Sequence, residues 1–396
     1  MPNNVTLIKG AGGLGRPLAG EDYISGYIHY TSVLPSGFGS ATASRIKQVF
    51  SVADAEGYGI TSTITTTSGG TASDLDVMHY HISEYFRAQP GGNLFVGVFG
   101  TGSTDFSEIT IMQNLADGKI RQVGIYKPST TFATSQCADI QTQLNLCYTN
   151  HKPLEAIYQA HFTSSTDLTS LSDLHALTAP NVSVCIGQDG ANLGSVLYST
   201  FGKSVGCVGI TLGAVSKSAV NESIAWVSRF NMATSELDTL AFANGQLYSA
   251  LSDGSIDAID GKGYVFLKKH VGINGSYFDN PYTCASTTSD YCRIPNNRTI
   301  NKAVRSLRSL LLPSMASPLL VNSDGTLSED TIAYFNSLCH QALDVMVRNY
   351  ELSAFGVTIN PAQNVLSTSE LIINVKLVPV GTADIITVNI GFATSI

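Results

Sequence analysis

The chain has 396 residues, which is enough for two or three domains and a sizeable core. Charged residues make up only 13% of it, hydrophobic residues make up 43%, and the net charge at pH 7 is −8. This composition disfavours a nucleic-acid partner, because phosphate binding needs a concentrated basic surface. The low share of charged residues favours a protein that buries much of its surface against partners.

Neither a membrane span nor a secretion leader is expected. The apolar stretch from Leu310 to Val321 is interrupted by Pro313 and Pro318, and no basic and then apolar stretch precedes Val5. The seven cysteines are scattered without a C-x-x-C pair, so reduced and mostly buried thiols are expected. Whether Cys284 and Cys292 form a disulfide is left open.

Residues 1–25 are predicted to form an extended arm. Val5, Leu7 and Ile8 belong to a short β-like run, and a glycine-rich segment follows. Gly10 to Gly15 satisfies G-x-G-x-x-G, but a dinucleotide site needs a helix to begin at the third glycine. Pro17 and Gly20 interrupt that turn, so no cofactor is expected here.

Residues 26–262 are predicted to form an outer α/β layer domain, because apolar β-like runs alternate with helical patterns. The expected strands are 24–28, 94–99, 120–126, 154–160, 182–186 and 207–212. Helices are expected near 75–87, 138–150 and 221–230. Ser73 or Asp74 should cap the first helix. A glycine-rich patch at 252–263 predicts a domain boundary or a hairpin.

Residues 263–384 are predicted to form a second domain with two helices and a small sheet. The first helix should be capped by Thr299 and end at Pro313, and the second should run from a Ser328 cap to about Tyr350. Strands are expected at 356–360 and 371–378. On the first helix, Lys302, Arg305 and Arg308 should form a basic stripe opposite the apolar face. This stripe is either a solvated surface or a docking face for an acidic partner.

The last strand, 385–396, is predicted to be a C-terminal arm. Its residues alternate, so that one face carries Ile386, Val388, Ile390 and Phe392. An apolar edge strand without charge or proline invites pairing with another chain. We therefore expect this strand to be donated to a neighbouring subunit.

Two further motifs are not expected to carry chemistry. Gly202-Lys203-Ser204-Val205-Gly206 fails as a phosphate loop, because Leu197 stands where that motif needs glycine. It also fails as a nucleophile elbow if a strand follows it. His79 and His81 are two residues apart on a predicted helix and so cannot share one metal ion. No catalytic residue, metal site or cofactor is predicted.

The order of parts after residue 299 resembles the contractile tail sheath proteins of bacteriophages and phage-tail-like particles. The resemblance lies in two helices joined by PSMASPLLVNSDG, followed by the strands FGVTIN, LIINVKLVPVG and IITVNIGF. The segment VPVGTADII resembles that family's turn into its last strand. GEDYISGYIHY and VFSVADAEGYGI are similar to the family's entry into its outer domain.

The resemblance implies a structural subunit that stacks in rings around a tail tube and exchanges terminal strands with its neighbours. It implies an inner, tube-facing domain at 263–384 and exchanged arms at Val5–Ile8 and Ile386–Phe392. Lys302, Arg305 and Arg308 become candidate tube contacts. The implied partners are further copies of the chain, the tube protein, and baseplate and tail-terminator proteins. The implied location is a virion tail or phage-tail-like particle assembled in the cytoplasm of a bacterial host.

Two alternatives remain at this point. A nucleotide-dependent α/β enzyme would need one of the glycine motifs to bind ligand. Another tail component, such as a tube or baseplate protein, would share the structural role without forming a long sheath.

Overall fold

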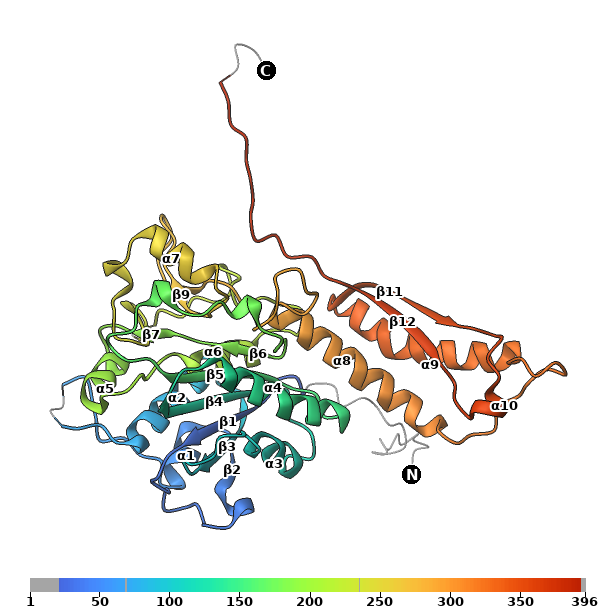
Figure 1. The fold of residues 1–396 in the computed structure, drawn as a ribbon, viewed down its shortest axis with the longest axis horizontal. Helices are drawn as coiled ribbons and strands as arrows, with labels where there is room; N and C mark the ends of the chain where they lie inside the picture. Colours follow the sequence, from blue (N-terminus) through green and yellow to red (C-terminus); the bar gives the residue numbers. More distant parts are fainter. Residues whose placement is uncertain (1–20, 68–69, 235, 393–396) are drawn as a thin grey trace, which may run out of the picture.

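The computed structural model describes residues 21–67, 70–234 and 236–392. The run containing Val5 to Ile8 and the glycine motif at 10–15 lie outside these residues. The described chain forms a larger body, residues 21–293, and a smaller elongated body, residues 303–379 (Figure 1). One long helix, α8 (Ile294–Leu311), runs from the first body into the second.

A six-stranded sheet with the order β2-β3-β1-β4-β5-β6 forms the centre of the larger body. Five strands are parallel, and β2 is antiparallel at one edge. The strands are β1 (Ile24–Tyr30), β2 (Ile46–Val49), β3 (Asn93–Phe99), β4 (Gln122–Thr131), β5 (Glu155–His161) and β6 (Val182–Val184). β1 is buried along its whole length, as expected for a parallel sheet covered on both faces. The α/β prediction and five of the six expected strands are confirmed.

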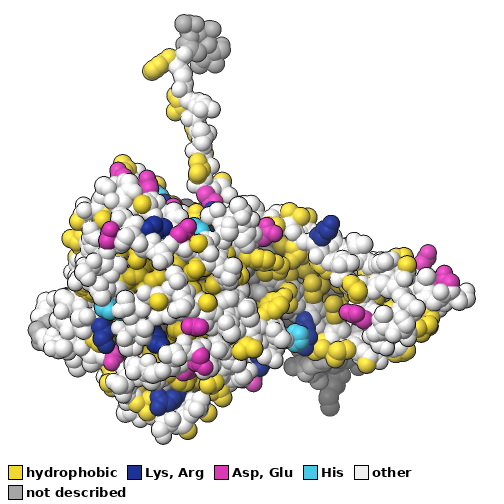
Figure 2. All heavy atoms as spheres, viewed as in Figure 1, with side chains coloured by type: hydrophobic (Ala, Val, Ile, Leu, Met, Phe, Trp, Pro, Cys, Tyr) yellow, Lys and Arg dark blue, Asp and Glu magenta, His cyan; other side chains and the backbone are white. Residues whose placement is uncertain are grey.

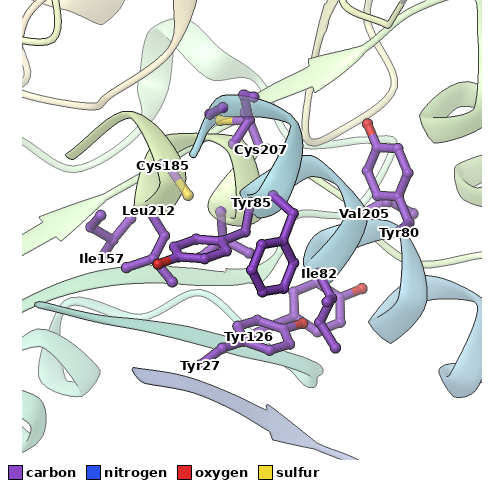
Figure 3. Close-up of a cluster of buried hydrophobic side chains, with 14 of the residues drawn as sticks. Tyr27, Tyr80, Ile82, Tyr85, Tyr126, Ile157, Cys185, Val205, Cys207 and Leu212 are labelled. Carbon is purple, nitrogen blue, oxygen red and sulfur yellow. The ribbon is translucent and has the colours of Figure 1, made fainter. Parts of the chain in front are cut away.

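Helices cover both faces of this sheet. One face carries α1 (Val52–Gly57), α2 (Asp74–Ala88), α5 (Leu193–Phe201) and α6 (Val208–Lys217). The other carries α3 (Glu108–Leu115) and α4 (Thr134–Thr149). Ser73 caps α2 in a capping box with Asp76, which confirms the expected start. Figure 3 shows the core between the sheet and α2 and α6, where Tyr27, Tyr85 and Tyr126 pack with Leu212.

Shorter elements complete the larger body. They are η1 (Thr42–Arg45), η2 (Leu168–Ser170), η3 (Leu174–Ala176), β7 (Gly187–Asp189), β8 (Leu240–Phe242), η4 (Tyr248–Ala250), α7 (Asp253–Asp260), β9 (Leu267–Lys268) and β10 (Tyr277–Phe278). The boundary expected after residue 262 falls inside this body, because Tyr264, Phe266 and Cys284 belong to its core.

The smaller body packs two helices under a two-stranded sheet. Its elements after α8 are η5 (Leu312–Ser314), α9 (Glu329–Arg348), β11 (Leu352–Ile359), α10 (Val365–Thr368) and β12 (Ile373–Pro379). Ser328 caps α9 by accepting from the N–H of Thr331, as expected. The core is small and contains Ala303, Leu343, Met346 and Leu352 in one cluster and Phe335 in another.

Three expectations about local structure are wrong. Residues 207–212 form no strand, because they belong to α6 and its N-cap. Residues 221–230 form turns and not a helix. α8 begins at Ile294, five residues before Thr299, with Pro295 in its first turn, where proline is well tolerated. Residues 385–392 do not pair with a strand of this chain, and their expected pairing with a neighbouring subunit stays a prediction.

Candidate assembly surfaces

The described part of the C-terminal arm is exposed. Ile386, Val388, Ile390 and Phe392 are each at least 70% exposed. The segment leaves the molecule beside the start of α8 and runs away from both bodies (Figure 1). Its root is held by an ion pair of 2.5 Å between Arg293 and Asp384. An exposed apolar segment of this kind marks an interaction surface.

The sheet of the smaller body can accept another strand. β11 pairs with β12 in antiparallel register, and these two strands form a sheet by themselves. Among the described residues, the outer edge of each strand has no strand beside it. One face packs on α8 and α9 through Phe355, Val375 and Leu377. A two-stranded sheet is marginal alone and gains main-chain hydrogen bonds when a third strand joins.

A cavity of about 670 Å³ lies at the end of this sheet, where β12 begins. Its walls are mostly apolar and include Val304 and Leu311 of α8, Phe335 of α9, and Leu371 and Ile373. Arg308 and His151 also line it, and no acidic residue of the described chain does. Figure 2 shows hydrophobic side chains gathered on the face where the smaller body meets the larger one.

The three basic residues of the expected stripe have different surroundings. Lys302 forms ion pairs with Asp22 at 2.7 Å and with Glu351 at 2.5 Å. Arg305 pairs with Asp22 at 2.9 Å. These two side chains therefore face the junction of the two bodies and are not an open stripe. Arg308 alone among the three is exposed.

Burial and neighbouring charges together shift the pKa values of the groups at the junction of the two bodies. Burial lowers the pKa of Arg305 to about 9, and the neighbouring Arg121 adds to this shift. Burial likewise lowers the pKa of Arg298 to about 10. Burial acts to raise the pKa of Asp22, but Lys302 and Arg305 outweigh it and hold that pKa below its usual value. Asp22, Arg298 and Arg305 are therefore ionised at neutral pH.

The edge of the sheet where a nucleotide would bind is filled by the chain itself. In open α/β sheets, ligands bind at the carboxyl ends of the strands where the strand order reverses, here between β1 and its neighbours. Lys127 is buried there, with its ammonium group over the rings of Tyr30 and Phe106. Tyr30 donates to Glu108 at 2.8 Å. This packing disfavours the nucleotide-dependent alternative.

The remaining motifs do not form the sites that their sequences resemble. Ser204 is buried and hydrogen-bonded to Phe162 and Ala243, and helix α5 precedes its loop, so it is no nucleophile elbow even though α6 follows. His79 pairs with Glu56 at 2.9 Å at the surface while His81 points into the core. In the described residues no group of three or more metal-binding side chains occurs.

The cysteines are buried, as expected. All seven cysteines are buried, and Cys284 and Cys292 both carry free thiols. Within the ranges 21–67, 70–234 and 236–392, no helix is both long and apolar enough to cross a membrane.

Comparisons with known proteins place the chain in a family and a fold class. Its fold is that of contractile tail sheath proteins. The chain belongs to the DUF2586 family: residues 4–281 match the family's N-terminal domain model, and residues 290–396 match its C-terminal domain model. No curated protein matches it in sequence.

Three solved structures show the fold. A chain of the anti-feeding prophage baseplate is 14% identical with a TM-score of 0.61, and the match covers 100% of this chain and 99% of that one. The sheath tail protein of Listeria innocua is 10% identical with a TM-score of 0.55, covering 92% and 93%. The sheath tail protein of Desulfitobacterium hafniense is 9% identical with a TM-score of 0.51, covering 95% and 100%. The resemblance drawn from the sequence is thus confirmed at the level of the fold.

Proposed function

We propose that this chain is a structural subunit of a contractile tail sheath. Copies would polymerise as a helical array of stacked rings around a tail tube, and contraction would drive the tube through a target envelope. The observation that carries this proposal is an exposed apolar arm on a chain with the sheath fold. New contacts between subunits supply the energy, and no nucleotide is consumed.

The proposal assigns the arm to strand exchange. The apolar face of the arm, Ile386, Val388, Ile390 and Phe392, is matched by the open β11–β12 sheet and the apolar cavity beside it. The root held at Arg293 directs the arm away from the chain's own sheet, so the receiving sheet belongs to another copy. Val5, Leu7 and Ile8 form the second proposed arm. Further partners are the tube, baseplate and tail-terminator proteins.

Removing residues 385–396 is expected to leave a folded subunit that cannot polymerise, because the described part of the arm contributes nothing to either core. Negative-stain electron microscopy and sedimentation across a concentration series measure this. Substituting serine at Ile386, Val388 and Ile390 should have the same effect, whereas serine at Thr387 and Asn389 on the opposite face should not. Long sheaths from the truncated chain would refute the strand-exchange assignment.

The same microscopy separates a sheath from a baseplate component. A sheath subunit should form long hollow cylinders with a helical surface when the tube protein is supplied. Single rings formed in the presence of the tube protein would favour a baseplate role. The structural similarity to a chain of the anti-feeding prophage baseplate is the reason to test this alternative.

Arg308 is the proposed direct tube contact of the three basic residues, since it is exposed and borders the cavity. Arg308→Glu should weaken co-assembly with the tube by about tenfold without changing the folded state, as expected for a charge at the rim of an interface. The matched control is Arg348→Glu at the exposed end of α9. Equal tube binding by the two variants, measured by co-sedimentation, would remove the assignment. Reversing Lys302 or Arg305 would instead disturb the internal ion pairs.

A further inference from the structure

The junction between the two bodies is formed by buried polar side chains. α8 inserts Asn297, Arg298, Thr299 and Asn301 into the larger body, and all four are buried. The core of the larger body reaches Ile294 and the core of the smaller body begins at Ala303. In the described chain, therefore, no hydrophobic cluster spans the turns of α8 between them.

Hydrogen bonds in this segment attach α8 to the larger body at several points. Arg298 donates to the hydroxyl of Ser218 at 2.7 Å and to the carbonyl of Ala219 at 3.2 Å. Asn301 donates to Glu155, at the start of β5, at 2.6 Å. Asn297 donates to the carbonyl of Pro180 at 2.8 Å. The first half of α8 is thus held on separate loops and strands of the larger body.

Ion pairs extend this attachment to the smaller body. Asp22, just before β1, accepts from Arg305 and pairs with Lys302, and Lys302 also pairs with Glu351, the residue before β11. A second contact joins the bodies here, because Asn221 donates to the carbonyl of Tyr350 at 3.0 Å. Apolar contacts are non-directional and let two bodies slide past each other. Charge-assisted hydrogen bonds need a specific geometry and therefore fix the orientation of one body relative to the other.

We propose that Asp22, Lys302, Arg305 and Glu351 form a latch that fixes the orientation of the smaller body relative to the larger one, with α8 as a rigid lever between them. Small polar interfaces between domains otherwise permit relative motion. The latch is a property of the single chain. Its use, transmitting rotation of one body to the other during contraction, rests on the proposed function.

The test measures the isolated full-length chain by hydrogen exchange and small-angle X-ray scattering. The double variant Lys302→Met with Glu351→Gln removes the central pair without changing the net charge. The control is Lys376→Met, an exposed position of β12. The double variant should exchange at least about tenfold faster at amides 299–308 and 349–353, while the sheet of the larger body keeps its protection. Its radius of gyration should rise.

A second variant guards against loss of folding. Asp22→Asn keeps the size of the side chain and weakens both of its ion pairs, so it should show a smaller change at the same amides. Equal exchange in the double variant and the control would overturn the latch. Loss of protection spread evenly over both bodies would overturn it as well, because the network would then support folding and not orientation. Neither outcome depends on whether the chain assembles into a sheath.

Discussion

Gly209→Ala is expected to lower the free energy of unfolding of the larger body by about 3 kcal/mol or more. α2 and α6 cross in close contact at this glycine. The Cβ of an alanine there would lie 2.2 Å from the carbonyl oxygen of His81 and 2.8 Å from its Cα. Both are backbone atoms of α2, so no side chain can rotate to relieve the overlap, and the helices must move apart.

Gly213, one turn later, meets α2 in the same way. A Cβ at this position would lie 2.6 Å from the carbonyl oxygen of Tyr85. Moving α6 would also disturb the packing of Leu212 and Val208 against the sheet at Gly124. Gly209→Ala therefore disturbs packing throughout the core drawn in Figure 3 and lowers the free energy of unfolding, because a densely packed core resists small shifts.

Urea unfolding followed by circular dichroism measures this effect, with Gly254→Ala as the matched control. Gly254 lies in α7, and a Cβ there meets no heavy atom within 4 Å. Alanine at 254 should raise the stability by about 0.5 to 1 kcal/mol, through helix propensity alone. If the two variants unfold at the same urea concentration, the close crossing of α2 and α6 does not determine the stability of the larger body.

This crossing involves α6, which the sequence pattern predicted as a strand. The central strands could be predicted because each is an apolar run bounded by turn residues. The segment VGITLGAVSK is equally apolar, since α6 is buried on nearly all sides, and its composition does not distinguish a buried helix from a strand. The spacing of Gly209 and Gly213 was the available signal for a helix that packs closely.

The junction could not be predicted for a different reason. Asn297, Arg298 and Asn301 have the composition of an exposed loop or a solvated helix face, yet they are buried against residues far away in the chain. Asp22 and Arg305 are 283 positions apart, and no local pattern connects them. The expectation of a basic stripe failed for Lys302 and Arg305 because their acidic partners lie outside the helix. The prediction of an apolar C-terminal arm needed only local alternation, and the structure leaves its apolar face exposed.

His81→Leu is expected to reduce the loss of stability in mild acid. His81 lies in the core at 1% exposure, and neither ring nitrogen has a hydrogen-bond partner. The rings of Tyr27, Tyr80 and Tyr126 lie 4.6 to 5.8 Å from it. Burial lowers the pKa of His81 well below its usual value, and the nearby His29 adds to this shift.

The direction of the pH effect follows from where the proton binds. The unfolded chain takes up a proton on His81 near pH 6.5, whereas the folded chain does not until a much lower pH. The unfolded state therefore gains protons first as the pH falls below about 6.5, and stability drops by about 1.4 kcal/mol per pH unit for this histidine. Above about pH 6.5, His81 does not make the stability depend on pH.

His29, a buried neighbour of His81, also makes the stability depend on pH, and His81→Leu does not remove this dependence. Burial also lowers the pKa of His29, although Asp74, at 3.7 Å, opposes the shift. Its other ring nitrogen bonds the hydroxyl of Tyr27 at 2.9 Å. The wild-type chain should thus lose stability in acid with contributions from both histidines, and His81→Leu should remove the contribution of His81 while keeping that of His29.

Chemical unfolding at pH 7 and pH 5 separates these contributions. Between the two values the stability of His81→Leu relative to wild type should improve by about 2 kcal/mol. His340→Leu, at an exposed position of α9, controls for the loss of one histidine. The same pH dependence in His81→Leu and His340→Leu would show that His81 does not cause the loss of stability in acid. Because leucine has no polar atom to leave unpaired in this aromatic core, the variant should also match or exceed wild type at pH 7.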